Sequence, residues 1–270
     1  MSAAANGTLA GLYRHPVKGF TPEPLACVRL APGEGFPFDR IWAVENGPSG
    51  FDPAAPAFVP KQKFAVLASI PRVATARTRY DEAGGLLHAS AEGLAPFVGR
   101  LDAAAGRDAF ATWLADLIGE AALGPLKVVD APPTHRFTDH PQGQVSLINL
   151  ASVRDLSARL GRELDPLRFR ANLYVEGWPA WVEHEWTGAV LRLGPVQGGV
   201  FKPIVRCAAT HVDPQTGVRD VEVTRALFDN YGHMHCGVYL KVTTAGDLAV
   251  GDACLGPEAA PARERGLQWT

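Results

Sequence analysis

The sequence predicts a mainly β fold with a few helices, of the α+β class. Its 270 residues include 28 glycines and 22 prolines, a frequency typical of short strands joined by turns. Between these residues, short segments alternate apolar and polar positions or are continuously apolar, as strands do. Few segments repeat apolar residues at helical spacing. The length suits one large domain or two small ones.

Composition excludes several classes of partner. Hydrophobic residues make up 47% and charged residues 20%, which is enough apolar mass for a sizeable core. The formal net charge of −2 gives no long-range attraction to nucleic acid or to an anionic membrane. No segment has the length of an apolar membrane span, and residues 1–8 lack a signal-peptide pattern. We therefore expect no nucleic-acid partner and no membrane association, and any anion site must be built locally from a few lysines and arginines.

The cysteines are scattered, and no two have the CxxC spacing. This argues against a zinc ribbon, a four-cysteine iron–sulfur cluster and a disulfide framework. We expect a reduced, cytoplasmic protein. The four are Cys27, Cys207, Cys236 and Cys254.

Residues 6–93 form the first expected unit. Closely spaced strands with Pro and Gly between them favour a small β-barrel or sandwich. The expected strands are 9–13, 25–30, 40–45, 64–70 and 86–89.

Residues 94–133 are expected to be a helical connector. Phe110, Trp113, Leu114 and Leu117 fall on one helical face, which predicts a surface helix over 105–118 that ends at Gly119.

Residues 134–256 form the second expected unit, and 257–270 a tail. The chain becomes rich in Pro and charge after Asp252 and is expected to be loose from there. Asn149 is the expected N-cap of a helix that ends at Gly161. A second helix is expected over 225–231 with Thr224 as its cap, and DPQTG at 213–217 predicts a tight turn. The expected strands are 145–148, 171–175, 189–193, 205–212, 237–243 and 248–250.

Several short motifs follow one another along the chain. The first half contains YRHPVKG at 13–19, FDRIWAV at 38–44 and KQK at 61–63. The second half contains FRANLYV at 169–175, Glu183, Trp186, PIVRC at 203–207, Thr210, DPQTG at 213–217, GVY at 237–239 and VGD at 250–252.

In this order the motifs resemble the MOSC domain family, over about residues 8–255. That family includes the C-terminal domain of molybdenum cofactor sulfurases, the mitochondrial amidoxime-reducing component and bacterial proteins that detoxify N-hydroxylated bases. The resemblance implies an N-terminal β-barrel-like domain followed by a MOSC-type β-barrel domain. It also implies that the molybdenum cofactor, a metal–pterin dithiolene, is the ligand.

Cys207 is the expected molybdenum ligand and catalytic residue by this resemblance. A thiolate suits a sulfur-rich metal centre, and Arg206 beside it favours the thiolate. The alternative is a buried structural cysteine, the commonest fate of a lone Cys.

The resemblance also implies a set of cofactor-binding residues, because the cofactor ends in a phosphate or nucleotide that needs cations and amide donors. Arg170 and Asn172 are expected to share one face of a strand, and the alternative for both is a solvated edge. Gly19 stands where the family usually has Ser, so a hydroxyl contact is lost. The expected set is Lys18, Gly19, Arg40, Arg170, Asn172 and Arg206.

Other polar residues near these motifs have simpler expected roles. Asp213 and Thr216 are interpreted as turn formers. Thr210 is a candidate lining residue, and His211 is expected at the surface. His233, His235 and Cys236 form an HxHC pattern, but two histidines without a convincing third ligand favour a place near the substrate pocket over a metal site.

The leading hypothesis is a molybdenum-cofactor-binding oxidoreductase that reduces N-hydroxylated or N-oxygenated small molecules. Its electrons would come from a separate flavin or iron–sulfur protein, because this chain lacks the cysteines for a cluster of its own. One alternative is a non-catalytic cofactor carrier or sulfur-transfer module, in which Cys207 carries a persulfide. Another is a binding protein whose site has decayed. A ligand cleft between the two β-rich units is expected in all three cases.

Overall fold

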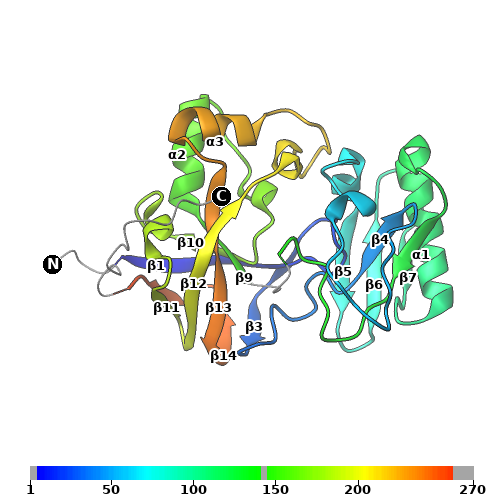
Figure 1. Ribbon diagram of the computed structural model, residues 1–270, viewed down its shortest axis with the longest axis horizontal. Helices are drawn as coiled ribbons and strands as arrows, with labels where there is room; N and C mark the ends of the chain where they lie inside the picture. Colours follow the sequence, from blue (N-terminus) through cyan, green and yellow to red (C-terminus); the bar gives the residue numbers. More distant parts are fainter. Residues whose placement is uncertain (1–4, 141–144, 258–270) are drawn as a thin grey trace.

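The computed structural model describes residues 5–140 and 145–257. Within these ranges the chain is mostly β, with three α-helices, as the sequence predicts (Figure 1). The strands are β1 (Asn6–Arg14), β2 (Glu23–Leu25), β3 (Cys27–Leu30), β4 (Ala43–Asn46), β5 (Arg77–Asp81), β6 (Leu86–Ser90), β7 (Phe97–Gly99), β8 (Leu126–Val129), β9 (Val145–Asn149), β10 (Leu173–Glu176), β11 (Val190–Leu193), β12 (Val196–Val205), β13 (His235–Thr244), β14 (Gly246–Ala249) and β15 (Ala253–Leu255).

The helices connect these strands. The α-helices are α1 (Ala104–Ile118), α2 (Leu150–Leu160) and α3 (Val223–Tyr231). Short 3-10 turns are η1 (Lys61–Lys63), η2 (Pro71–Thr75), η3 (Gly119–Ala121), η4 (Pro166–Phe169), η5 (Val182–Trp186) and η6 (Ala208–His211).

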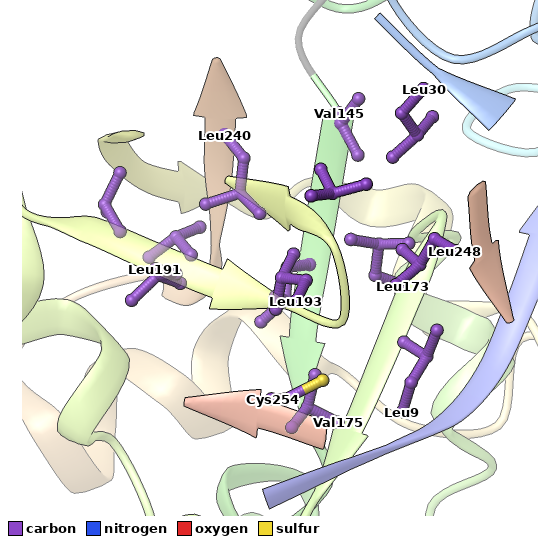
Figure 2. Close-up of a cluster of buried hydrophobic side chains, with 14 of the residues drawn as sticks. Leu9, Leu30, Val145, Leu173, Val175, Leu191, Leu193, Leu240, Leu248 and Cys254 are labelled. Carbon is purple, nitrogen blue, oxygen red and sulfur yellow. The ribbon is translucent and has the colours of Figure 1, made fainter. Parts of the chain in front are cut away.

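Seven strands form a closed barrel, in the order β10-β9-β13-β12-β11-β15-β1, and β1 pairs back to β10. Closure removes the open sheet edges that would otherwise invite pairing with another chain. The strands alternate inward and outward side chains, so β11 buries Leu191 and Leu193 while its intervening positions are exposed. Figure 2 shows such side chains from most strands converging inside the ring.

The first strand of the chain belongs to this C-terminal barrel. Thr8 on β1 lies opposite Glu176 on β10 and Ala253 on β15, and β3 pairs with β14. The strand pairing thus crosses the expected boundary after residue 93, and the boundaries at 93 and 133 stay predictions. The range 94–133 contains the expected helix, but it also contains β7 and β8.

A second unit lies beside the barrel, on the right of Figure 1. Its sheets are β5-β6-β7 and β4-β8, and α1 covers them. The helix buries Phe110, Trp113, Leu114 and Leu117 against this unit, which confirms the predicted face.

The helices α2 and α3 cover one side of the barrel (Figure 1). The Asn149 side chain accepts a hydrogen bond from the Ala151 amide, and Gly161 ends α2 in the left-handed conformation, both as predicted. The helix α3 begins earlier than expected, at Val223, and its N-cap is Glu222 rather than Thr224.

Two segments expected as strands are turns. Residues 64–70 are largely buried, but the amides of Ser69 and Ile70 bond back to the Val66 carbonyl. In 205–212, β12 ends at Val205 and η6 follows. A run of apolar residues in the sequence indicates that the segment is buried, but burial alone does not distinguish a strand from a buried turn.

Two further bounds differ from expectation. The segment after Asp252 was expected to be loose, yet β15 lies within the barrel; residues 258–270 of the predicted tail lie outside the described residues. The predicted strands at 40–45 and 171–175 begin only at Ala43 and Leu173. Within the described ranges, no helix is long and apolar enough to cross a membrane.

Candidate functional site

A cavity of about 330 Å³ lies between the barrel and the second unit. This volume falls at the lower end of the range for small-molecule sites. Both sides contribute to its wall, so the predicted cleft is present. Six of the seven predicted site residues line it: Lys18, Gly19, Arg40, Arg170, Arg206 and Cys207.

Cys207 follows the end of β12 and is partly exposed in the cavity. Its backbone carbonyl accepts hydrogen bonds from the Thr210 amide at 3.0 Å and the Thr210 hydroxyl at 2.9 Å. These bonds turn the chain into η6 and fix the backbone behind the sulfur. Thr210 itself also lines the cavity, as expected.

Lys61 is a site residue that the sequence analysis did not select. It lies on η1, lines the cavity and interacts electrostatically with Cys207. Burial opposes its charge, but Asp139 and then Cys207 raise the pKa of Lys61 above its usual value. The KQK motif at 61–63 contains this residue, but the sequence alone does not show which of its two lysines lines the cavity.

Arg40 is held by a buried acid beside it in the chain. The Asp39 carboxylate accepts from the Arg40 guanidinium, and it also accepts from the His15 amide at 2.7 Å. Burial, with Arg40 and Arg170 next in importance, lowers the pKa of His15 to about 3, so this imidazole is neutral. Because His15 is neutral, the negative charge of Asp39 is balanced by Arg40 alone in this contact. The Asp39 carboxylate also fixes the position of the Arg40 guanidinium in the cavity wall.

Arg40 and Arg170 each donate a hydrogen bond to a backbone carbonyl on the opposite side of the cavity. The Arg40 Nη2 donates to the Arg170 carbonyl at 3.0 Å, while the Arg170 Nη1 donates to the Phe20 carbonyl at 2.5 Å. Each arginine thus reaches across the cavity to the opposite unit. Burial, then Arg40, lowers the pKa of Arg170 to about 10, and the group remains charged at neutral pH.

One guanidinium nitrogen of the Arg40–Arg170 pair donates no hydrogen bond to a described residue. The Arg170 Nη2 is buried and has no hydrogen-bond partner among the described residues. An unpaired buried donor on a charged group is costly, and an anion in the cavity would satisfy it.

Lys18 reaches the same cavity from the second unit and is 4% exposed. Its Nζ donates to the Phe137 carbonyl at 2.9 Å and to the Asp139 carboxylate at 2.6 Å. Burial lowers the pKa of Lys18, against the opposite effect of Asp139. Asp139 also lies 3.8 Å from the Lys61 Nζ, so one carboxylate is shared by two ammonium groups.

Gly19 has a φ of +93°, a conformation that favours glycine. A Cβ at this position would lie 2.9 Å from both the Ala65 carbonyl oxygen and the Val66 Cα. A serine at this position would therefore not fit this backbone without a shift of the 65–66 segment.

Asn172 is not brought to the cavity, which corrects the expectation for it. It is 1% exposed; its Oδ1 accepts from the Ser146 amide and hydroxyl, and its Nδ2 donates to the Tyr13 carbonyl. Arg170 has a φ of +52° and precedes the strand, so the two residues do not share a strand face. Asn172 joins β9 to β1 instead.

Arg206 lines the cavity, but its three guanidinium nitrogens donate to backbone carbonyls. Its Nε and Nη2 bond to the Cys236 carbonyl, and its Nη1 bonds to the Phe169 carbonyl at 2.8 Å. These bonds favour a role in positioning the two backbone segments around Cys207 rather than a direct ligand contact.

The DPQTG segment forms the predicted turn. The Asp213 Oδ1 accepts from the Gln215 and Thr216 amides, and the Gly217 amide bonds to the Asp213 carbonyl. The Asp213 Oδ2 also pairs with the buried Arg168, whose side chain lies beside the cavity. The turn thus supports the cavity wall.

The histidines of the HxHC pattern lie outside the cavity lining. The rings of His233 and His235 are 5.1 Å apart and gather around His184. His211 is half-buried and contacts the Thr224 hydroxyl at 2.9 Å. Burial raises the pKa of the fully buried Cys236 to about 12. Across the described ranges, no three His, Cys, Asp or Glu residues are placed to hold a metal ion.

The site therefore combines a thiol with several fixed cations. Asp139 is the one acidic side chain among the described lining residues, against Lys18, Lys61, Arg40 and Arg170. Such a surplus of positive charge, with an unused Arg170 donor, suits a ligand that carries an anionic group. A partly exposed thiol in the same cavity suits a soft metal.

Comparison with known families gives two matches. The MOSC domain matches residues 134–254, and the MOSC N-terminal beta barrel domain matches residues 6–121.

Curated relatives match part of the chain. A molybdenum cofactor sulfurase 2 of Culex quinquefasciatus is 32% identical over 151 residues, which is 50% of this chain and 20% of the relative. The mitochondrial amidoxime reducing component 2 of Rattus norvegicus is 31% identical over 120 residues, which is 40% of this chain and 35% of the relative. This chain therefore spans only a minor part of these relatives' length.

Among solved structures, the YUAD protein of Bacillus subtilis aligns with a TM-score of 0.42 and 12% identity, over 94% of this chain and 97% of that chain. Since the two MOSC matches together account for nearly all of the chain, the protein belongs to the MOSC domain family.

Proposed function

We propose that this protein binds the molybdenum cofactor and reduces N-hydroxylated or N-oxygenated small molecules. One observation carries the proposal: the Cys207 thiol lines the same cavity as the Arg40 and Arg170 guanidinium groups, one of which has an unused buried donor. Relatives named as amidoxime-reducing components and molybdenum cofactor sulfurases support the cofactor assignment.

Each residue has a defined task in this proposal. Cys207 would supply a thiolate ligand to the molybdenum, and Arg40, Arg170 and Lys18 would hold the anionic end of the pterin. The bound metal would supply the oxygen-removing redox chemistry.

Reduction of an N-hydroxy group consumes a pair of electrons and a pair of protons and releases the oxygen as water. Tyr239 lines the cavity, and burial raises its pKa. Its hydroxyl therefore keeps its proton at neutral pH and is available to donate a hydrogen bond to the substrate oxygen.

We also propose that the electrons come from a separate flavin or iron–sulfur protein. The four cysteines lie apart: Cys27 is exposed on β3, Cys207 lines the cavity, and Cys236 and Cys254 are buried in β13 and β15. They cannot converge on one iron–sulfur cluster without unfolding the barrel.

The test is metal and pterin analysis of protein purified from a molybdenum-replete host. We expect molybdenum and molybdopterin in equal amounts, and reduction of benzamidoxime to benzamidine with reduced methyl viologen as electron donor. Protein that contains neither molybdenum nor pterin after such expression would contradict the proposal.

A second candidate is a non-catalytic cofactor carrier or sulfur-transfer module, favoured by the similarity to molybdenum cofactor sulfurases. In that role Cys207 would carry a persulfide or hold the cofactor for delivery. Protein that contains the cofactor, shows no turnover with reduced methyl viologen and transfers labelled sulfur from Cys207 would favour this candidate.

A further inference from the structure

One cation of the cavity differs from the rest, because its side chain has no partner among the residues that the structure describes. Lys202 lies on β12 and lines the cavity, and its side chain has no hydrogen bond or ion pair with any described residue. By contrast, Lys18 pairs with Asp139, Arg40 with Asp39, and Lys61 with Asp139 and Cys207.

Lys202 stands on the wall that also carries the proposed reacting groups. It is paired in register with Tyr239 on β13, and the same strand leads from Lys202 into Cys207. Arg40 and Arg170 reach the cavity from other segments, namely the region before β4 and the end of η4. In the proposed function, Arg40, Arg170 and Lys18 bind the anionic end of the cofactor. The Lys202 ammonium group is not needed for that contact and is available to another ligand.

The surroundings of Lys202 suit a planar molecule. His140 also lines the cavity, with its ring centroid 5.5 Å from that of Tyr239 and 5.3 Å from that of Phe201. Lys202 lowers the pKa of His140, after the larger effect of burial, which favours a neutral imidazole beside the lysine. A flat ring can lie against such a wall with a charged substituent at the ammonium group.

We propose that Lys202 is a specificity-determining residue, which binds an anionic substituent such as a carboxylate on the substrate. The preferred substrates are then N-hydroxylated or N-oxygenated compounds that also carry a negative charge. An ammonium group that gains a carboxylate inside a cavity makes a charge-assisted hydrogen bond that a neutral analogue cannot make. This inference rests on the proposed reductase function for the identity of the reacting group.

A matched pair of substrates tests the proposal. Benzamidoxime is neutral, and 4-carboxybenzamidoxime is its anionic counterpart. The measurement is the ratio of kcat/KM for the anionic to the neutral compound, with reduced methyl viologen as donor. In Lys202→Met, which keeps the aliphatic length, this ratio should fall about five- to tenfold, mainly through a higher KM for the acid. Lys202→Arg should retain most of the ratio.

The control is Lys241→Met on the neighbouring strand. The Lys241 ammonium group lies 4.4 Å from the centre of the Phe201 ring, and Lys241 does not line the cavity. This variant should keep the wild-type ratio. A Lys202→Met enzyme whose ratio equals that of wild type would overturn the inference.

Calorimetry on the purified holoprotein supplies a readout independent of turnover. The non-reactive analogue 4-carboxybenzamidine should bind wild type more tightly than Lys202→Met, by the same five- to tenfold. A loss of pterin in Lys202→Met would instead assign the lysine to the cofactor and overturn the proposal. Failure of the proposed function would appear separately, as absence of molybdenum or of benzamidoxime reduction in wild type.

Discussion

The Cys207 sulfur is partly exposed, while the backbone around it is held by Thr210 and Arg206. Cys207→Ser should therefore fold normally, with a change in unfolding free energy within about 0.5 kcal/mol. Serine is a harder and far less acidic ligand, so the variant should lose molybdenum while the untouched arginines retain some pterin. Elemental analysis and pterin fluorescence measure both quantities.

The matched control is Cys27→Ser, which removes an exposed thiol on β3 and should keep the full metal content. X-ray absorption at the molybdenum edge counts the sulfur ligands directly. If Cys207→Ser has the sulfur count and the turnover of wild type, the cysteine is not a ligand.

Arg170 has a left-handed backbone conformation, which glycine adopts without strain. Glycine is therefore the replacement that removes the side chain with the least disturbance of the backbone. Arg170→Gly removes the guanidinium but relieves backbone strain, so part of the lost stability is offset. Pterin retention should fall on the order of tenfold, because a charge-assisted bond to the anionic end is lost. Dialysis followed by pterin assay measures retention, with the exposed Arg154→Gly of α2 as the control for losing an arginine. Unchanged retention in Arg170→Gly would remove this residue from the anion site.

Gly19 has a positive φ and lies against the backbone of residues 65–66. Gly19→Ser should destabilise the fold by about 1–3 kcal/mol, because a Cβ would clash with the 65–66 backbone at positive φ. Gly33→Ser has a similar φ of +80° but nothing within 4 Å, so it isolates the conformational cost. Urea denaturation compares the two; equal losses would show that the close approach to residues 65–66 is unimportant.

The motifs that resemble the family located most of the cavity residues but not the contacts between them. Cys207, Arg40 and Arg170 could be found because the motifs around them fix their identity. Lys61 and Asp139 could not, because their role depends on loops that meet only in the folded chain. Asn172 was misplaced because Arg170 leaves the extended conformation two residues earlier, and no alternation rule predicts a left-handed arginine.

At the level of elements, the turn η5 places a buried acid against α2. Glu183 accepts hydrogen bonds from the Asn149 side-chain Nδ2 at 2.8 Å and the Ser152 hydroxyl at 2.9 Å. Burial raises the pKa of Glu183 to about 7. The folded protein therefore holds this proton more tightly than the unfolded chain does, and the resulting stability is lost as pH rises from about 4.5 to 7.

Glu183→Gln keeps an acceptor and removes the titration. The unfolding free energy of wild type relative to this variant should fall with rising pH, by up to about 1.4 kcal/mol per unit in that window. Urea denaturation at several pH values measures it. Burial lowers the pKa of the neighbouring His184 to about 3, which gives the opposite trend, but both proteins share this histidine. A difference that rises or stays flat between pH 4.5 and 7 would contradict the assignment.

Elements whose bounds are fixed by neighbouring residues in the sequence could be predicted. Elements whose bounds are fixed by contacts with distant parts of the chain could not. The helix α2 has its own cap and its own left-handed glycine, so its bounds could be derived from sequence. The turn at 64–70 is apolar because its side chains belong to three hydrophobic clusters, and its apolar sequence does not distinguish it from a strand. The same holds for η6, whose start depends on the Thr210 bonds to Cys207.

At the scale of the whole molecule, the barrel depends on a strand from the other end of the chain. A fragment of residues 134–257 would leave the edges of β10 and β15 unpaired, because β1 closes the ring between them. We expect this fragment to aggregate or to unfold without cooperativity. A peptide of residues 5–31, which supplies β1, β2 and β3, should restore a cooperative transition when it is co-expressed.

Size-exclusion chromatography and thermal melting by circular dichroism distinguish the outcomes. A fragment that is monomeric and melts cooperatively without the peptide would show that β1 is dispensable. Sequence patterns predicted a strand near β1, but they contain no information on which sheet it joins. That choice depends on partners more than 150 residues away, so the division into two consecutive units describes the sequence order better than the strand pairing.

The position of β1 also matters during synthesis. A ribosome adds roughly 5–20 residues per second, so β1 emerges roughly 12–50 s before its partner β15 exists. During that interval β1, which includes Leu9 and Leu12, can pair with β2 and later with β10, but the barrel that buries these side chains cannot close. The nascent chain is therefore exposed to chaperones and to neighbouring chains until translation is almost complete, and its yield in a cell should depend on how quickly the last strand is delivered.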